Sequence, residues 1–401
     1  MTDAATTTDT TRVDMLVDDL LATCDPTGDR FTFRGEQYER GLAWVWFPEG
    51  FGGLGAPAEL QRRVDGRLRE AGASSSEVGW NGFGLFLAAP TIVAHADDAL
   101  KTRLLRPLFT GEEVWCQLFS EPGAGSDLAS VATRAVRDGD EWVVNGQKVW
   151  NTLAHVADRG MLVTRTDPDA PKHKGLTYFA LDMHAAGVEV RPLRQMTGEA
   201  EFNEVYLTDV HVPDADRVGD VNDGWRVSMT TLMNERVTIG GAVAGRGSGP
   251  IGDALAVWAG LPDRQDPVLR DELAKMWIEA EVLRLTNARA AANRKAGIAG
   301  PEGSVSKLAF AEVNKRIYEL CIAILGPEGT LFPDRYEMVR PEQAALTGGG
   351  DPRKMFLRAR ANSIEGGTSE ILRNIMGERV LGLPGEPRVD KDLAWSKVPR
   401  S

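Results

Sequence analysis

Apolar residues recur every three to four positions in the first part of the chain, a period that predicts amphipathic helices. From Val13 to Cys24 the apolar positions share one face and aspartates occupy the other, and the same period runs through Glu59–Ala71 and Pro90–Leu108. Residues Met1–Arg12 are rich in Thr, Ala and Asp and lack the basic start and apolar run of a secretion signal. We therefore expect a frayed terminus followed by a mainly helical region.

The middle of the chain changes to short segments of strand-like composition, separated by turn residues. Asp138-Gly139 and Asn145-Gly146 are dipeptides that accept the positive φ angles of tight hairpin turns, which indicates antiparallel neighbours. The predicted strands are Val114–Phe119, Thr133–Arg137, Trp142–Val144, Lys148–Asn151, Met161–Thr164, Leu176–Leu181, Val188–Pro192 and Val205–Val212. Together they predict a compact β domain between about Glu113 and Arg217.

Helical periodicity returns after Gly224, in stretches long enough for an antiparallel bundle. The predicted helices are Trp225–Ala244, Leu269–Ala296, Ser304–Leu325 and Ser369–Leu381, with a looser segment over Pro327–Asp351. The expected fold class is α+β. It comprises an N-terminal helical domain (1–112), a middle antiparallel β domain (113–217), a C-terminal four-helix bundle (218–384) and a tail (385–401).

Composition narrows the possible classes of function. The 401 residues are 42% hydrophobic and 26% charged, as in an ordinary globular protein, and no window approaches the roughly 18 apolar residues of a membrane helix. A net charge of -12 argues against a nucleic-acid partner. Cys24, Cys116 and Cys321 lie far apart, so we expect free thiols and a cytoplasmic location. The five histidines lack ligand spacing, so we expect no metal.

Two strings carry candidate chemistry. Pro122-Gly123-Ala124-Gly125 follows a predicted strand and would let a flat ring or a phosphate approach the main chain, although a tight turn is the simpler interpretation of this string alone. In Asn145–Thr152, the indole of Trp150 and the hydroxyl of Thr152 are expected on one face of a strand. The chain has no G-x-S-x-G elbow and no P-loop, and its G-x-G-like strings do not follow a strand.

The same two strings, SEPGAGSD at Ser120–Asp127 and NGQKVWNT at Asn145–Thr152, resemble the middle-domain signatures of the acyl-CoA dehydrogenase family. FNEVYLTDVHVP at Phe202–Pro213 looks like the family's exit strand, and EGGTSEILRNIMGERVLGLP at Glu365–Pro384 looks like its C-terminal signature helix. The resemblance covers roughly Trp44–Pro384. It implies FAD-dependent α,β-dehydrogenation of an acyl-CoA thioester, electron transfer to an electron-transfer flavoprotein, and a homodimer or homotetramer.

The resemblance also assigns site residues by position. Cofactor contacts would come from Gln117, Phe119, Ser120, Trp150, Thr152, Thr368 and Glu370, with Trp150 against the flavin ring and Thr152 near the atom that accepts hydride. Ser126 would lie near the CoA moiety. A plain helix N-cap is the simpler interpretation of Thr368, and both roles can coexist.

Removal of an α proton needs a carboxylate beside the thioester with a pKa raised toward neutrality. Many family members carry it just before the Gly-Thr of the C-terminal signature, where this chain has Gly366. Isovaleryl- and long-chain-type members use a Glu-Arg pair on the first bundle helix, which here is Glu235-Arg236. The resemblance therefore implies Glu235 as the base, Arg236 near the substrate, and the Gly366 N–H as a donor to the thioester carbonyl. Without it, a mid-helix Glu beside an Arg is by default a solvated surface residue.

One family string is missing. The RxxFG motif, which reaches the FAD of the neighbouring subunit, is absent between Gly245 and Gln265, and Arg246 and Arg264 are the candidates to replace it. Two other interpretations stay open: a flavin oxidase or monooxygenase of the same fold, and a non-catalytic FAD-binding subunit of a heteromeric dehydrogenase. The small residues of Gly240–Gly245 and at Gly366 lead us to expect branched or bulky acyl groups, although close helix packing explains them equally well.

Overall fold

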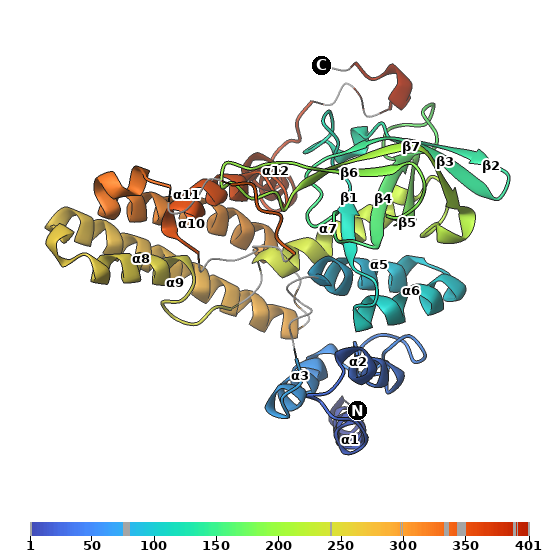
Figure 1. Cartoon of the computed structure of the whole chain (residues 1–401), viewed down its shortest axis with the longest axis horizontal. Coiled ribbons are helices and arrows are strands. Elements are labelled where there is room, and N and C mark those ends of the chain that lie inside the picture. Colours follow the sequence, from blue (N-terminus) through green and yellow to red (C-terminus); the bar gives the residue numbers. More distant parts are fainter. Residues whose placement is uncertain are drawn as a thin grey trace.

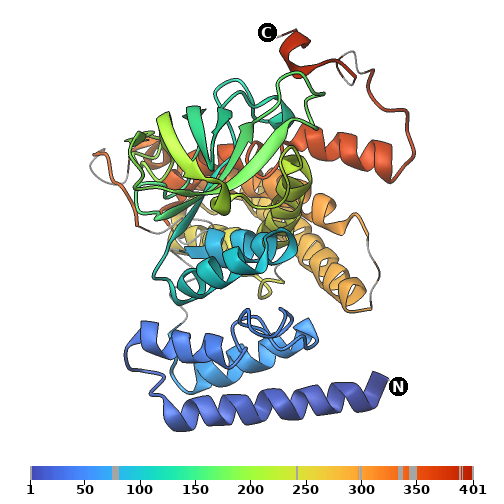
Figure 2. The ribbon, with the colours of Figure 1, turned by 90° about the vertical axis from the view of Figure 1, so that its right-hand side faces the viewer.

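The computed structural model describes residues 2–74, 81–240, 243–296, 298, 300–332, 337–342, 350–387, 390 and 392–399. The first helices of the chain form a separate layer at one end, the sheet lies at the other end, and the later helices extend to one side (Figure 1). The view from the side shows the same order, with the N-terminus and the C-terminus at opposite ends of the molecule (Figure 2).

The N-terminal region is helical, as predicted. Its helices are α1 (Thr2–Thr23), α2 (Arg30–Glu39), α3 (Gln61–Glu70), α5 (Ala89–His95) and α6 (Asp98–Thr110). The expected frayed terminus is wrong, because α1 begins at Thr2 and no Gly or Pro interrupts the chain before Pro26. The stretch Pro90–Leu108 forms two helices, since the carboxylate of Asp97 accepts the Leu100 N–H at 2.8 Å and so caps a new helix.

The middle of the chain forms one seven-stranded sheet. Its strands are β1 (Trp115–Leu118), β2 (Arg134–Asp138), β3 (Glu141–Lys148), β4 (Arg159–Arg165), β5 (Leu176–Asp182), β6 (Val188–Pro192) and β7 (Asn203–Pro213). Their order is β1-β4-β2-β3-β7-β6, and β5 also pairs with β4. Four pairings are antiparallel, as predicted, whereas β1 and β2 each pair with β4 in parallel. The parallel pairs join strands that are not consecutive, so no turn dipeptide marks them.

Only one of the two predicted hairpin turns exists. Asp138-Gly139 joins β2 to β3, and Gly139 has a φ of +60°. Asn145-Gly146 instead lies inside β3, where the register with β7 shifts at a bulge. A Cβ at Gly146 would lie 2.4 Å from Oγ1 of Thr133, the residue before β2. Glycine is therefore needed here because the chain around Thr133 approaches closely. An Asn-Gly dipeptide looks the same in the sequence whether it forms a hairpin turn or lies inside a bulged strand.

The C-terminal half of the chain is a helical bundle. Its helices are α7 (Gly224–Gly240), α8 (Pro250–Gly260), α9 (Pro267–Lys295), α10 (Glu302–Leu325), α11 (Pro352–Arg358) and α12 (Ser369–Arg379). The predicted helices correspond to α7, α9, α10 and α12, while the shorter α8 and α11 were not predicted. Helix α10 is central and contacts each of the others, and much of the looser segment 327–351 lies outside the described residues.

The C-terminal tail returns to the sheet region (Figure 1). The Trp395 backbone N–H donates to the Ala170 carbonyl at 2.9 Å, and its Nε1 donates to the Ser130 carbonyl at 3.3 Å. Across the part of the chain that the structure describes, no helix could cross a membrane, and no group of His, Cys, Asp or Glu could hold a metal ion.

Candidate functional site

A buried ion pair supports the turn that follows β1. The Glu121 carboxylate is almost completely buried and accepts hydrogen bonds from the N–H groups of Ala132 (2.6 Å) and Thr133 (2.9 Å) and from Lys148 Nζ (2.8 Å). Burial alone would raise the pKa of Glu121, but the Lys148 ammonium and the other donors lower it. The carboxylate is therefore ionised at neutral pH.

Lys148 joins three strands at the point where β1 ends. It is fully buried on β3, and its Nζ also donates to the carbonyls of Phe119 (3.1 Å) and Val163 (2.7 Å). The Val149 N–H donates to the Ser120 carbonyl at 2.9 Å. Phe119 and Ser120 are consequently held against the end of β3.

The turn itself is open on its outer side. Glu121 and Ala124 close it with two backbone hydrogen bonds of 3.0 Å. A Cβ added at Gly123 or Gly125 would meet no heavy atom within 4 Å, and Ser126 is exposed. A flat ring or a phosphate could therefore approach these main-chain groups without obstruction.

Trp150 and Thr152 lie beyond the end of β3, which is Lys148, so the expectation that they share a strand face is wrong. Trp150 has a φ of +63°, which ends the alternation of faces that a strand would impose. Its indole is 57% exposed and meets the Phe202 ring edge-on, with 5.8 Å between centroids. Thr152 is half-buried. A large exposed aromatic side chain is thus held in a defined position.

Backbone pairing holds the 150–153 segment on both sides. Asn151 Nδ2 donates to the Gln117 carbonyl on β1 at 2.8 Å, and the backbones of Asn151 and Asn203 exchange hydrogen bonds of 3.0 and 3.1 Å. The Leu153 N–H donates to the Glu201 carbonyl at 2.9 Å. The structure therefore brings together, at the ends of β1 and β3, the predicted cofactor residues Gln117, Phe119, Ser120, Trp150 and Thr152.

Glu235 lies on a helix that packs against both the sheet and α5. On α7, Oγ1 of Thr231 is 2.9 Å from Oγ1 of Thr91 on α5 and 3.2 Å from the hydroxyl of Tyr178 on β5, and all three residues are buried. Glu235 follows one turn later on the same face and is half-buried. This face is therefore packed rather than solvated. The side chain of the neighbouring Arg236 lies outside the described residues.

Lys307 holds the Gly366-Gly367 turn from inside the bundle. It is 2% exposed on α10, and its Nζ donates to the carbonyls of Asn362 (2.9 Å) and Gly367 (2.6 Å). Burial lowers the pKa of Lys307, while the negative charges of Glu365 and Glu235 act in the opposite direction. One buried ammonium thus holds the turn and lies within electrostatic reach of the predicted base. A single Lys in a helix gives no sequence signal for such a role.

Glu365 stands beside the position that other family members use for the base, but its carboxylate is engaged elsewhere. Arg358 binds both of its oxygens, at 3.1 and 3.0 Å, and Asn362 Nδ2 donates to Oε1 at 2.8 Å. Gly366 and Gly367 follow with φ of +61° and +94°, a left-handed conformation that strains most side chains. The turn therefore presents backbone rather than a carboxylate.

The two predicted cofactor residues of α12 are placed at its start. Thr368 is the N-cap, and its Oγ1 accepts the Ile371 N–H at 3.2 Å, which is the simpler role predicted for it. Glu370 is exposed, with its carboxylate 3.7 Å from the Arg373 guanidinium. The side chain of Glu370 therefore faces solvent in the single chain.

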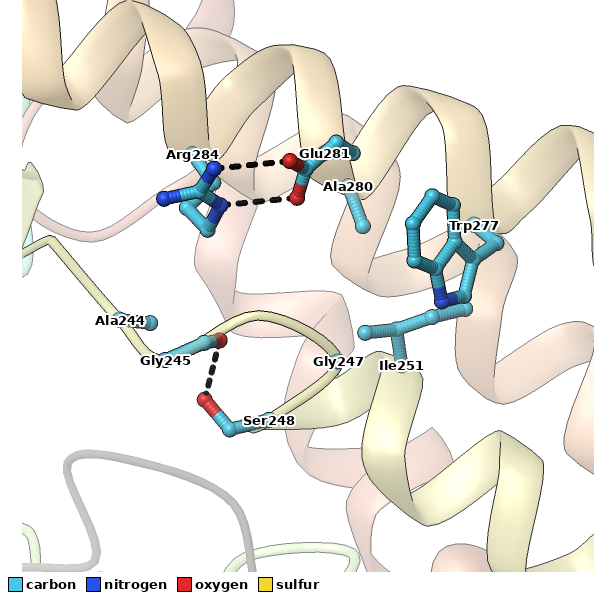
Figure 3. A pocket seen from close by; sticks show the side chains of 9 residues that line it. All are labelled: Ala244, Gly245, Gly247, Ser248, Ile251, Trp277, Ala280, Glu281 and Arg284. Atoms are coloured by element: carbon cyan, nitrogen blue, oxygen red, sulfur yellow. Dashed lines mark hydrogen bonds and ion pairs between the residues drawn. The ribbon is translucent and has the colours of Figure 1, made fainter.

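Both arginines considered as substitutes for the absent RxxFG motif have acidic partners within the chain. The Arg246 guanidinium lies 4.8 Å from the centre of the Trp277 ring and 3.7 Å from Glu281, and Arg264 pairs with Glu328. Figure 3 shows the adjoining small pocket, in which the 244–248 turn faces the Glu281–Arg284 ion pair of α9. Arg246 stays largely exposed despite these contacts, whereas the Arg264 side chain is about one third exposed.

Comparison with known families decides the assignment. The model described as "Acyl-CoA dehydrogenase, middle domain" matches residues 116–210, and "Acyl-CoA dehydrogenase, C-terminal domain" matches residues 222–381. The chain belongs to the acyl-CoA dehydrogenase family. It is accordingly an oxidoreductase of that family, and the family and the enzyme class predicted from its sequence motifs are confirmed.

Curated relatives of this acyl-CoA dehydrogenase include two from Mycobacterium tuberculosis. Acyl-CoA dehydrogenase IpdE1 is 37% identical over 352 residues, which cover 87% of this chain and 86% of IpdE1. Acyl-CoA dehydrogenase FadE34 is 40% identical over 351 residues, which cover 86% of this chain but 45% of FadE34. The chain thus spans less than half the length of FadE34.

Solved structures share the fold. The Tcur3481–Tcur3483 steroid ACAD has a TM-score of 0.70 and 26% identity, with 96% of this chain and 99% of that chain covered. The ChsE4–ChsE5 complex from Mycobacterium tuberculosis has a TM-score of 0.68 and 28% identity, with 96% and 98% covered. These likenesses confirm the predicted arrangement of helices, sheet and helical bundle.

Proposed function

We propose that this acyl-CoA dehydrogenase uses FAD to remove two hydrogens from the α and β carbons of an acyl-CoA thioester, giving the 2-enoyl-CoA. The observation that carries the proposal is the placement of Glu235, half-buried one turn after the buried Thr231 on α7, together with the Gly366-Gly367 turn that Lys307 holds through the Gly367 carbonyl. In the proposed site, Glu235 supplies the carboxylate and the turn supplies a backbone donor. This is the combination that abstraction of an α proton needs.

The residues at the ends of β1 and β3 fit a flavin. The exposed indole of Trp150 offers a flat apolar surface, and the open glycine turn offers main-chain N–H groups to a ring edge or a phosphate. Oδ1 of Asn151 is buried and has no hydrogen-bond partner among the described residues, so it can accept a bond from a bound group. When bound, FAD supplies the acceptor for the β hydride. Gln117, Phe119, Ser120, Trp150 and Thr152 would hold it, together with Thr368 and Glu370.

We assign the proton transfer to Glu235. Its carboxylate would take the α proton, while the Gly366 N–H donates to the thioester oxygen and so stabilises the charge that develops there. Gly366 provides this donor without a competing side chain. Arg236 and Ser126 are the proposed contacts to the rest of the substrate.

For the acyl group, we propose a branched or ring-bearing structure. The basis for this proposal is that Gly366 has no side chain where other family members carry a carboxylate. Relatives support this class: a structural neighbour is a steroid ACAD, and a curated relative that is 27% identical is the cyclohexane-1-carbonyl-CoA dehydrogenase of Geobacter metallireducens. The proposed preference is therefore for branched or ring-bearing acyl groups over straight acyl chains.

We further propose the domain limits 1–112, 113–217 and 218–384 with a tail at 385–401, a cytoplasmic location, and an electron-transfer flavoprotein as the electron acceptor. The free and buried thiols of Cys116 and Cys321 support the location. Assembly is proposed to be a homodimer or homotetramer. The lack of RxxFG and the likeness to ChsE4–ChsE5 favour a second possibility, in which another acyl-CoA dehydrogenase chain completes the FAD site.

The test uses the purified chain, both alone and co-expressed with candidate partner chains. Each preparation is mixed anaerobically with an acyl-CoA thioester, and the visible absorbance of bound oxidised FAD is followed for bleaching. The panel is butyryl-CoA, isovaleryl-CoA, cyclohexane-1-carbonyl-CoA and a CoA thioester of a steroid side chain. Glu235→Gln should retain FAD, but substrate should reduce that FAD at least about 10³-fold more slowly, within the range of about 10²–10⁴ for losing a general base.

The outcomes separate the alternatives. Near-normal bleaching in Glu235→Gln would remove Glu235 from the mechanism. Bleaching only in the presence of a partner chain would identify a heteromer, and rapid O2 consumption by the reduced enzyme would identify an oxidase. Absence of FAD from every preparation would refute the proposed function.

A further inference from the structure

Arg358 lies at the junction between the helical bundle and the sheet region. It is the last residue of α11, and only 10% of its side chain is exposed. On the bundle side its two terminal nitrogens bind the Glu365 carboxylate, next to Gly366. On the sheet side its Nε lies 3.3 Å from Oε1 of Glu201, whose side chain is only 3% exposed, an ion pair without the geometry of a hydrogen bond. One guanidinium therefore bridges two carboxylates that belong to different layers.

Each carboxylate is attached to one half of the proposed site. The backbone carbonyl of Glu201 accepts the Leu153 N–H, and so fixes the end of the segment that carries Trp150 and Thr152. Glu365 directly precedes the Gly366-Gly367 turn. Movement at either end of this bridge would consequently change the spacing between the two halves.

Contacts around the guanidinium extend the bridge toward Trp150. The Arg358 guanidinium carbon lies 5.6 Å from the centre of the Phe202 ring, and Phe202 meets the Trp150 indole edge-on. Asn362 donates to Glu365, and its own Oδ1 accepts from Asn314 Nδ2 at 2.6 Å. Burial would lower the pKa of Arg358, but Glu365 and Glu201 raise it, so the cation is retained.

We propose that Arg358 is a positioning residue that sets the distance between the Gly366 turn, where the thioester carbonyl binds, and the Trp150 segment, where the flavin binds. The inference rests on the proposed function and deepens it. A planar guanidinium suits this task because its fork can bind one carboxylate with two nitrogens while a third nitrogen reaches another. A lysine ammonium is a single point charge, so it cannot replace the contacts of the guanidinium to Glu365 and to Glu201 at the same time.

The first test compares Arg358→Met, Arg358→Lys and Glu201→Gln with Arg360→Met. The matched control, Arg360, lies in the same segment and pairs with Glu319 of α10, without a contact to the sheet among those described. Flavin reduction is followed by anaerobic stopped flow with the panel member that reduces the wild type fastest. A misplacement on the scale of 1 Å costs up to about 10²-fold, so we expect a 10- to 100-fold slower limiting rate, with the substrate Kd changed less than about threefold. Arg360→Met should behave as the wild type.

A second readout does not depend on turnover. Backbone hydrogen exchange should become about tenfold faster in Arg358→Met, both in the 150–153 segment and in the 362–368 turn, because the bridge opposes local opening of both. The losses of rate in Arg358→Met and Glu201→Gln should not multiply in the double variant, since Arg358→Met already removes the Arg358–Glu201 contact that Glu201→Gln weakens.

The result that overturns the inference is a normal limiting rate in the FAD-loaded Arg358→Met fraction, even if its thermal stability is lower. Equal slowing in Arg360→Met, or faster exchange in only one of the two segments, would do the same. Failure of the wild type to bind FAD or be reduced by any thioester would instead refute the proposed function. The hydrogen-exchange comparison would still decide whether the bridge couples the two layers.

Discussion

Lys148→Met removes the cation of a fully buried ion pair and keeps the length of the side chain. The substitution deletes the three hydrogen bonds that Lys148 Nζ donates to Glu121, Phe119 and Val163, and it leaves the Glu121 carboxylate buried without its counterion. Breaking a buried pair by removing one partner typically costs about 3–5 kcal/mol. Glu121 retains its backbone donors at Ala132 and Thr133, which favours the lower end of that range. We expect the free energy of unfolding to fall by about 3 kcal/mol at pH 7.

The effect should depend on pH in a defined direction. In the wild type the pKa of Glu121 lies below its value of 4.5 in the unfolded chain. Its ionised form therefore stabilises the fold above that value, and the contribution is lost as pH falls through the folded pKa. In Lys148→Met, burial without the ammonium should raise the pKa of Glu121, so that the ionised carboxylate destabilises the fold at neutral pH and protonation relieves the cost. The difference between the two proteins should shrink as the pH falls from about 7 to about 5.

The assay is guanidinium unfolding followed by circular dichroism, at a fixed excess of FAD because a bound ligand shifts apparent stability. Arg191→Met is the control, since it removes an exposed ion pair with Glu189 and should change the midpoint little. The double variant Lys148→Met/Glu121→Gln should recover part of the loss. A loss below about 1 kcal/mol at pH 7, or one that does not vary with pH, would refute the reasoning.

Three other outcomes are expected. Trp150→Ala should weaken FAD binding and Thr152→Ala should slow flavin reduction or loosen FAD, measured by flavin retention and stopped flow, whereas Trp46→Ala, which alters another exposed indole, should do neither. Thr368→Ala should lower the free energy of unfolding by about 1 kcal/mol in thermal unfolding, because the N-cap of α12 is lost. Thr368→Ser should keep the wild-type stability. An unchanged stability in Thr368→Ala would show that Thr368 does not stabilise α12 as its N-cap. For kcat/KM, cyclohexane-1-carbonyl-CoA should match or exceed butyryl-CoA, and a deficit of about tenfold or more for the ring would end the bulky-substrate hypothesis.

Local signals predicted local structure. The Asp138-Gly139 hairpin and the long periodic helices are confirmed, because each depends on residues close together in sequence. Asn145-Gly146 was misinterpreted since a glycine inside a bulge and a glycine in a turn look alike, and the difference lies in the approach of Thr133 from another strand. The parallel pairing of β1 with β4 was not predicted, because the two strands are far apart in the sequence and no tight turn joins them.

The candidate site was predictable only where a motif marks it. Family motifs indicated Glu235 and Trp150, whose roles are proposals here. The buried charges that hold the site, Lys307 and Arg358, carry no motif, because an isolated basic residue has the same appearance in sequence whether it is solvated or buried. Lys307 and Gly367 lie 60 residues apart, and Glu201 is far from Arg358 in sequence, so these contacts emerge only from the folded chain.

The tail contact bears on how the protein is handled. Trp395 binds the Ser130 carbonyl, four residues after Ser126, the proposed substrate contact, and the C-terminus lies at the opposite end of the molecule from the N-terminus (Figure 2). An affinity tag or a surface tether at the C-terminus would therefore pull on this contact and disturb the neighbouring turn. The same attachment before α1 would leave it untouched, so immobilised enzyme should be coupled through its N-terminal end.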